Sequence, residues 1–294
     1  MKSAGLTLTI VVEGQNLNYG ESLANISSLK KIQLGNKLYT YMSKQALKYE
    51  LRKSISNYLG QESAPVSSDT KDKAVVQFSE DATIDKYAEV ALFGYMRTEA
   101  QKNGVHRSAV ARVTDAISLE SYHNNIDFLT NQRMASLADK FNNIAQTENH
   151  KSLYAYTISV DLDALLVDDN YETKIDSNLG YSYIDALLSS VENLSRSIKG
   201  GTSNLHPLFL IGTISEIKSP FFEDSIKYDE EKETINVDRI KDYLDNSAIL
   251  NPHIGYVSGT FANEKQLKDA LSLDSVGNVF SKLKKEVKEY YEGN

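Results

Sequence analysis

Four aspartates in one short stretch of the chain are the residues best suited to holding a divalent cation. Asp161 and Asp163 alternate along a predicted strand and therefore share a face, and the next turn carries Asp168 and Asp169. Carboxylate oxygens are the ligands that Mg²⁺ prefers, and a bound Mg²⁺ can serve phosphodiester hydrolysis. A solvated strand edge followed by an Asp-rich turn produces the same pattern, and we favour this second interpretation.

A predicted helix at 43–58 carries a row of cations. Three of them recur every four residues and so line one face of the helix beside its apolar stripe. Glu50 is the only acid on this helix, so these cations lack the usual partners one turn away. Such a basic ridge suits a phosphate backbone, which it can position without reading bases; an ordinary solvated face is the alternative. The ridge is Lys44, Lys48 and Arg52, and Gln45 and Lys53 extend this candidate phosphate-binding face.

Three other patches contain groups that can bind a polyanion. The first follows the first predicted strand and offers amide donors, a stacking-capable aromatic ring and a glycine. The second flanks the loop after Phe93–Met96, and the third follows a predicted helix, where successive backbone N–H groups can form an anion nest. Gly-Gly after a helix is also a common stop signal. The residues are Asn16, Asn18 and Tyr19 in the first patch; Arg97, Lys102, Arg107 and Arg112 in the second; and Arg196, Lys199, Gly200, Gly201 and Asn204 in the third.

Sequence signatures of common enzymes are absent. The chain has no GxxxxGKS phosphate loop, no GxGxxG after a strand, no GxSxG elbow and no HExxH. It has no Cys, and its five His are scattered without metal-ligand spacing. We therefore predict no catalytic residue, no cofactor and no metal site, and the lack of Cys suits a reducing cytoplasm.

Local patterns predict the elements that carry these residues. Leu6–Val12 is mostly apolar and predicts a buried strand, and the Gly-, Asn- and Ser-containing stretch 13–41 predicts a long irregular loop. Ser43 can cap the helix, and Gly60 supplies a left-handed stop. Further strands are predicted at 108–118, 153–166, 207–217 and 254–261, and helices at 84–94, 182–198 and 279–291, with a polar helical stretch after 118.

This order of elements predicts an α+β fold. Strand, helix, insertion, strand, helix, strand is compatible with a split βαβ sheet of the ferredoxin or RNA-recognition type that carries large insertions. No apolar run approaches the roughly 18 residues of a membrane span, and we expect no membrane partner. At 294 residues the chain has room for about two domains, or one with large insertions.

The net charge of −8 argues at first against a nucleic-acid partner. However, residues 1–60 hold eight basic and three acidic side chains, which leaves 24 basic and 37 acidic ones for the rest. Binding of a polyanion responds to the field within about a Debye length, and the total charge of the chain matters less. We therefore expect nucleic-acid contacts to be confined to one groove.

Several segments together resemble a known family. Leu6–Val12 running into Asn16-Leu-Asn-Tyr-Gly-Glu21, the segment Tyr39–Tyr49 (YTYMSKQALKY), Leu92–Met96 (LFGYM), and Arg107 followed by Val113–Leu119 (VTDAISL) form the set. This set resembles the DevR-type CRISPR-associated proteins, the seventh Cas family, of type I-B systems. The resemblance covers residues 5–130 well and 150–215 loosely.

The resemblance implies a backbone subunit of the Cascade surveillance complex, whose type I members are not enzymes. Such subunits have an RNA-recognition-motif-like (ferredoxin-like) palm with finger and thumb insertions, and several copies stack along the guide crRNA. On this basis the palm is expected at 1–60 and 151–294, with the thumb near 196–225, and an inserted finger or web domain at 61–150. The expected partners are crRNA, the target DNA strand through that RNA, other copies of the chain and other Cascade subunits.

Two rival functions stay open. Related subunits of type III systems cut RNA with a loop aspartate, and the four aspartates keep a Mg²⁺-dependent RNA-cleaving role open. The family name also includes an autoregulator, which requires specific DNA binding, although no helix-turn-helix pattern is present.

Overall fold

The strand predicted at 6–12 is the centre of the main sheet in the computed structural model, which describes residues 3–23, 26–68, 76–98, 104–139, 141, 144–249 and 251–293. Strand β1 (Gly5–Gln15) pairs antiparallel with β14 (Lys151–Asp161) on one side and with β19 (Pro207–Ser215) on the other. All its residues from 5 to 12 are buried, because both faces of the sheet are covered there. A nearly continuous apolar run is what a strand covered on both faces requires.

The main sheet has nine strands among the described residues, in the order β23-β22-β19-β1-β14-β11-β5-β4, with β10 also paired to β14. Helix α1 (Lys44–Leu59) lies between β1 and β14 along the chain, and α4 (Ser177–Glu192) lies between β14 and β19, the two strands that flank β1 in the sheet. This confirms the α+β class. The other strands of the sheet are β4 (Lys31–Leu34), β5 (Lys37–Met42), β10 (Ala111–Val113), β11 (Ala116–Ser118), β22 (His253–Tyr256) and β23 (Leu273–Asp274).

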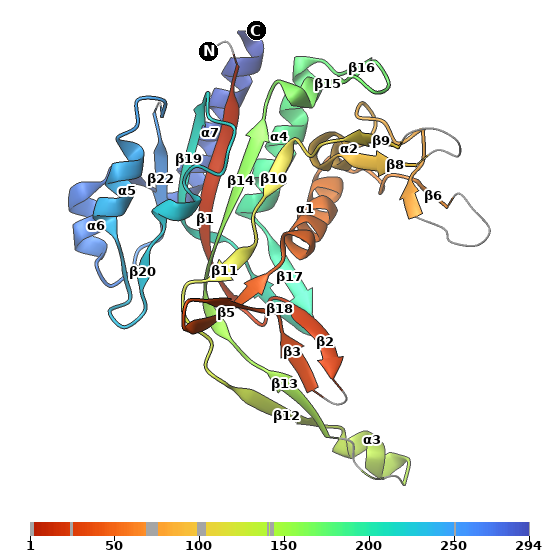
Figure 1. Ribbon diagram of the computed structural model, residues 1–294, viewed down its shortest axis with the longest axis vertical. Helices are drawn as coiled ribbons and strands as arrows, with labels where there is room; N and C mark the ends of the chain where they lie inside the picture. Colours follow the sequence, from red (N-terminus) through yellow and green to blue (C-terminus); the bar gives the residue numbers. More distant parts are fainter. Residues whose placement is uncertain are drawn as a thin grey trace.

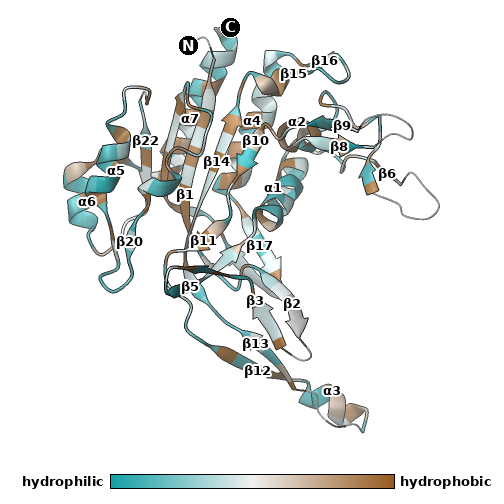
Figure 2. Ribbon diagram, in the orientation of Figure 1, coloured by the Kyte–Doolittle hydropathy of each residue, from teal (hydrophilic) through white to brown (hydrophobic). Residues whose placement is uncertain are grey.

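Two hydrophobic cores lie on opposite faces of this sheet. Leu6, Leu8 and Ile10 of β1 point into the first core, which is closed by α1, α2 (Ala88–Phe93), α4 and α7 (Val276–Glu292). Val11 points the other way, into a core closed by α5 (Val237–Leu244) and α6 (Glu264–Ala270). Figure 2 shows the hydrophobic residues gathered in the central strands and the helices beside them. None of the described helices is long and apolar enough to cross a bilayer.

Two parts of the chain project from the main sheet (Figure 1). The arm at the bottom of the view consists of β12 (Ile126–Thr130), α3 (Gln132–Leu137) and β13 (Ile144–Glu148). Its two strands belong to a small sheet that also contains β3 (Ile26–Leu29) and β2 (Tyr19–Leu23). The side lobe at the right consists of α2 and two strand pairs. One pair is β6 (Val66–Ser68) and β7 (Val76–Phe78), and the other is β8 (Tyr95–Arg97) and β9 (Val105–Arg107).

Short strand pairs and 3₁₀ turns complete the described structure. The pair β17–β18 forms a hairpin beside the lower end of β1, which becomes important for the site below. The short elements are η1 (Ala164–Leu166), β15 (Val167–Asp168), β16 (Thr173–Lys174), β17 (Ser195–Ile198), β18 (Gly201–Asn204), η2 (Glu223–Ser225), β20 (Tyr228–Asp229) and β21 (Thr234–Ile235).

Helix α1 follows its sequence signals closely. Ser43 is its N-cap and Gly60 its left-handed C-cap, with φ of 63°, and Leu47, Leu51 and Ile55 are its buried stripe. The prediction of an irregular loop at 13–41 was wrong, because this stretch forms strands β2 to β5. These strands form two local pairs, β2 with β3 and β4 with β5. The pairing that joins them to the rest of the protein is distant, since β3 also pairs with β13 and β5 with β11.

Two predicted helices also differ in the structure. The helix predicted at 182–198 begins at 177 and ends at Glu192, and residues 195–204 form the hairpin instead. The polar stretch predicted as helical after 118 is mainly the two strands of the arm, with α3 at its tip. In both places strand pairing with a neighbouring segment, which the helical periodicity did not indicate, decided the structure.

The main sheet takes strands from every predicted domain range. Strands β10 and β11 lie within 61–150 yet pair with β14, and β19 lies within 196–225 yet pairs with β1. The described residues of 196–225 also contain the β17–β18 hairpin, except for its first residue Ser195, and this hairpin lies outside the main sheet. The predicted ranges and the strands of the sheet therefore do not coincide at these places.

Candidate nucleic-acid interface

The first turn of α1 is held in place by three contacts. Ser43 Oγ accepts a hydrogen bond from Ala46 N at 3.4 Å, and the side-chain amide of Asn18 lies 3.0 Å from the same hydroxyl. Asp115 Oδ1 accepts from Lys44 N at 2.6 Å, so a second free N–H of the helix start is satisfied. Asn18 was predicted to be a donor on the surface, but it is buried and positions the basic helix.

The basic ridge lies along one flank of α1, with Lys44 exposed and Lys48 and Arg52 half-buried. Burial lowers the pKa of the Lys48 ammonium, and the neighbouring charges of Arg52 and Lys44 lower it further. Among the described residues, none of the three forms an ion pair with an acid. The ridge is therefore a set of like charges that an anionic ligand would stabilise. Gln45 and Lys53 are exposed on the outer side of the helix.

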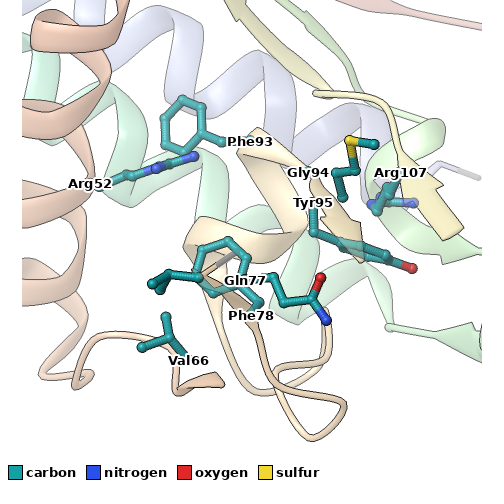
Figure 3. A pocket seen from close by; sticks show the side chains of 10 residues that line it. Arg52, Val66, Gln77, Phe78, Phe93, Gly94, Tyr95 and Arg107 are labelled. Atoms are coloured by element: carbon teal, nitrogen blue, oxygen red, sulfur yellow. The ribbon is translucent and has the colours of Figure 1, made fainter. Parts of the chain in front are cut away.

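A groove of about 410 Å³ lies between α1 and the side lobe (Figure 3). The ring of Phe93 lies against the ridge, with its centroid 6.0 Å from Lys48 Nζ and 5.2 Å from the guanidinium carbon of Arg52. Alternating cations and aromatic rings are typical of surfaces that bind single-stranded nucleic acid. The groove is lined by Arg52, Val66, Val76, Gln77, Phe78, Phe93, Gly94, Tyr95, Met96 and Arg107.

Arg107, from the second predicted patch, lies in this groove. Its Nη2 donates to Ala164 O at 2.8 Å and its Nη1 to Val167 O, which orient the guanidinium. Burial lowers the pKa of Arg107, while the nearby carboxylate of Asp168 raises it, and the net shift is downward. Arg107 is thus a half-buried cation at the end of the groove opposite Arg52 (Figure 3).

Arg97 lies behind the wall of the groove. It is only 2% exposed, its Nη2 donates to Ala82 O at 2.6 Å, and its guanidinium lies 4.2 Å from the ring centre of Tyr95 and 4.8 Å from that of Tyr171. The Tyr95 hydroxyl in turn donates to Asp168 Oδ2 at 2.9 Å. In this conformation Arg97 therefore supports an aromatic wall and offers no surface to a ligand.

Arg112 lies on the far face of the main sheet. Its neighbours Ala111 and Val113 point into the core beneath α1, and the period of two along a strand leaves Arg112 exposed on the opposite face. It therefore does not join the basic ridge. Lys102 of the same predicted patch lies outside the described residues.

The structure brings the first and third patches together. Arg196 in β17 donates from Nε to Leu17 O and pairs through Nη1 with Glu50 Oε1 of α1 at 2.8 Å. At the hairpin turn, Lys199 Nζ lies 3.9 Å from the ring centre of Tyr19. Two segments almost 180 residues apart therefore form one wall on the flank of α1 opposite the groove.

The anion nest predicted at the glycines is instead a hairpin turn. Lys199 and Gly200 have φ of 49° and 80°, and Ile198 pairs with Gly201 across the turn. Positive φ at both central residues is the signature of a type I′ turn, which Gly favours. The exposed Gly200, Gly201 and Asn204 lie on this hairpin, and Asn204 Oδ1 accepts from His206 N at 3.1 Å.

Asn16 closes the turn after β1. Its Oδ1 accepts from His150 N at 2.8 Å, and its own N–H donates to His150 O at 3.0 Å. With φ of 54° it adopts the left-handed conformation that Asn tolerates better than most residues. Its amide is therefore engaged within the protein, although Asn16, like Tyr19, is half-exposed.

The four aspartates separate into two environments. Lys218 Nζ lies 2.6 Å from Asp161 Oδ1 and 2.9 Å from Asp163 Oδ2, so a cation of the chain already occupies the place of a metal. Asp168 is buried against Tyr95, and Asp169 is exposed. The described residues contain no group of three or more potential ligands that could hold a metal ion.

Sequence reasoning missed the roles of several side chains in this region. Phe78 was not singled out, because nothing local to β7 shows that it faces α1. Tyr49 is 64% exposed on the outer face of α1, one turn from Gln45 and from Lys53. Tyr49 is four residues from each of these polar residues, so helical spacing alone could have placed it on the same face of α1.

The fold and site together define an α+β protein with a basic helix between two walls, one partly aromatic, suited to a single-stranded polyanion. The sequence matches the family model "CRISPR-associated negative auto-regulator DevR/Csa2" over residues 6–235, and the chain belongs to this family. The resemblance inferred from the sequence is thus confirmed.

Solved structures support the same fold. One is described as "CRISPR RNA-guided surveillance complex, pre-nicking", with a TM-score of 0.65 and 12% identity over 96% of this chain and 100% of that one. Another, "CRISPR RNA-guided surveillance complex", has a TM-score of 0.61 and 14% identity over 96% of this chain and 99% of that one. A comparison with curated proteins found no match.

Proposed function

We propose that the protein is a non-catalytic, guide-RNA-binding backbone subunit of a type I CRISPR surveillance complex. The observation that carries this proposal is the basic ridge of α1, whose three cations have no acidic partner among the described residues and lie beside an aromatic groove. Membership of the DevR/Csa2 family and the fold shared with surveillance-complex chains support it. The partners are then crRNA and, through its pairing, a target DNA strand.

The chemistry of the ridge suits a ligand of variable sequence. Lysine and arginine on phosphates fix the register of a strand, and base pairing with a second strand supplies sequence recognition. In the proposed function the hairpin β17–β18 is the thumb element, and the side lobe and the arm are the finger and web elements. The ridge between them holds the backbone of the RNA.

Assembly with further copies follows from a different surface. The arm exposes large apolar side chains, among them Phe128 at 61%, Leu137 at 76% and Phe141 at 100%. Exposed apolar patches on a projecting element mark interaction sites. Contact between this arm and an unlike surface of the next copy would build an open helical array along the RNA, with other Cascade subunits at its ends.

Removing the ridge tests the proposal. Lys44→Ala, Lys48→Ala and Arg52→Ala together should weaken RNA binding about equally for all sequences and lower the salt slope by roughly 0.7 per lost phosphate contact. The measurement is fluorescence anisotropy of labelled RNA at several salt concentrations. The matched control is Lys282→Ala, Lys285→Ala and Lys288→Ala on α7, whose lysines pair with Asp274, Glu289 and Glu292.

The control variant should keep the affinity and the salt slope of the parent protein. Unchanged RNA affinity in the ridge variant would contradict the proposal. Cleavage of complementary RNA in the presence of Mg²⁺, lost on Asp161→Ala, would favour the nuclease alternative. A footprint on DNA at physiological salt that exceeds the affinity for RNA would favour the autoregulator.

A further inference from the structure

Lys48 lies among charges of its own sign, unlike many other lysines of the chain. Lys268, for example, pairs with Glu264, and this contact raises the pKa of its ammonium group. Among the described residues no acid pairs with Lys48, and its neighbours one turn away on α1 are Lys44 and Arg52. Like charges nearby disfavour the ammonium form of a lysine.

Burial acts on Lys48 in the same direction. The side chain is half-buried beside the ring of Phe93, whose centroid lies 6.0 Å from Nζ. Burial lowers the pKa of Lys48, and the charges of Arg52 and Lys44 lower it further. On α2, Glu89 acts on Arg52 and raises the pKa of that guanidinium. At a given pH, Lys48 therefore has a larger fraction of neutral amine, which is the nucleophilic form of lysine.

The two cations that flank Lys48 can hold a phosphate beside this amine. Residues four apart on a helix lie on one face, with about 5–6 Å between their Cβ atoms. Lys44 is exposed, and the Nε of Arg52 is buried without a hydrogen-bond partner among the described residues. Arginine donors match the geometry of phosphate oxygens. A phosphate bound by these two side chains would lie within reach of the Lys48 amine.

We propose that Lys48 is a modification site that is acylated by a small acyl phosphate, whose phosphate is held by Arg52 and Lys44. In an acyl phosphate the phosphate is bonded directly to the acyl group, so a molecule of this size spans neighbouring side chains of the ridge. In a coenzyme A thioester a long chain separates the phosphates from the acyl group. The spacing of the ridge therefore favours the acyl phosphate.

The transfer needs no further reactant. The neutral Nζ of Lys48 attacks the carbonyl carbon, a bond between nitrogen and carbon forms, and the bond from that carbon to the bridging oxygen breaks. The electron pair of the broken bond leaves with inorganic phosphate, and one proton of the nitrogen passes to solvent. The product is a neutral amide, so the ridge loses one of its three positive charges.

Acylation of Lys48 would lower the affinity of the protein for RNA. This consequence rests on the proposed function, because the lost charge belongs to the ridge that holds the RNA backbone. The affinity should fall about equally for all sequences, and the salt slope should fall by roughly 0.7, which corresponds to one phosphate contact.

Acetyl phosphate is the probe for the modification, and peptide mass spectrometry of the parent protein gives the acylation rate of each lysine without RNA. Lys48 should react about fivefold faster than Lys268. The matched control is Lys199, whose pKa burial also lowers but which lies in a hairpin turn away from the ridge. Lys48 should outpace Lys199 with acetyl phosphate and match it with phenyl acetate, a donor without phosphate.

Arg52→Gln provides a second measurement, because it removes a phosphate holder and should abolish the preference of Lys48 for acetyl phosphate over phenyl acetate. Equal rates for Lys48 and Lys199 with acetyl phosphate would overturn the inference. The same preference for Lys48 with both donors would also overturn it, since the phosphate would then play no part.

Lys48→Arg separates the modification from its effect on RNA, because it keeps a cation that cannot be acylated. Treatment with acetyl phosphate should lower the RNA affinity of the parent protein more than that of Lys48→Arg. Selective acylation of Lys48 with unchanged RNA affinity would contradict the proposed function and support the modification site. Ridge-dependent RNA binding together with equal acylation rates would overturn this inference alone.

Discussion

Arg196 and Glu50 join the β17–β18 hairpin to helix α1 through an ion pair of 2.8 Å between Nη1 and Oε1. The side chains are only 11% and 12% exposed, and Arg196 Nε also donates to Leu17 O. Glu50, the acid of α1, is therefore engaged on one flank of the helix, and the cations on the other flank form no ion pair with a described residue. The ridge is basic partly because the structure uses Glu50 elsewhere.

Breaking this pair should destabilise the protein. Arg196→Met leaves the Glu50 carboxylate nearly buried without its partner, at a cost of about 3 kcal/mol in the free energy of unfolding. The double variant Arg196→Met with Glu50→Leu removes both charges and should cost less than the single one. Urea denaturation of the parent and variant proteins measures this. Equal losses for the single and double variants would show that the unpaired Glu50 carboxylate is not the source of the cost.

Asp163 should make stability depend on pH in the acid range. Burial raises its pKa, but hydrogen bonds from Tyr290, Lys218 and Ser3 outweigh this and lower the pKa to about 2 from the ordinary 3.8. A carboxylate with a lowered pKa stabilises the fold above its unfolded pKa, and this stabilisation is lost as pH falls through the folded value.

The stability difference between the parent protein and Asp163→Asn should therefore be full above about pH 4 and shrink toward pH 2. Urea midpoints measured across this range test the expectation. Because the side chain is partly exposed, the difference should also fall in high salt. A difference that stays constant with pH would contradict the assigned hydrogen bonds.

Gly94 is required at the start of the groove wall. Its φ is +69°, and a Cβ built there would lie 2.2 Å from Arg107 O. Gly94→Ala should therefore cost more than about 2 kcal/mol in stability and disturb the groove. The matched control is Gly35→Ala, which has a similar φ of +62° but nothing within 4 Å, and should cost about 1 kcal/mol. Thermal unfolding of both variants compares them directly.

The arm should govern self-association more than stability. Phe128→Ser, Leu137→Ser and Phe141→Ser change exposed side chains, so the unfolding free energy should stay within about 0.5 kcal/mol for each. Sedimentation velocity in the presence of a long guide RNA should show fewer copies per RNA for the triple variant than for the parent protein. An unchanged stoichiometry would place the contact between copies on another surface.

Much of the main sheet and its helices was predictable because their signals are local. The central strand, the cap and stop of α1 and the terminal helix follow from apolar runs, Ser43 and Gly60. The strands between 19 and 42 were missed, because their Gly, Asn and Ser content favoured a loop and the pairing of β3 with β13 and of β5 with β11 joins segments far apart along the chain. The hairpin at 195–204 was missed because Gly-Gly can end a helix as well as form a turn.

For the candidate site too, some features follow from the sequence and others only from the tertiary structure. The sequence alone determined that α1 is an amphipathic helix with Lys44, Lys48 and Arg52 on one flank, because residues four apart on a helix must lie together. Only the tertiary structure decided that Arg97 is buried, that Arg112 lies across the sheet, and that Asn18 holds the helix start. The groove also belongs to the tertiary structure, because its rings come from segments whose proximity depends on packing and leaves no pattern in the sequence.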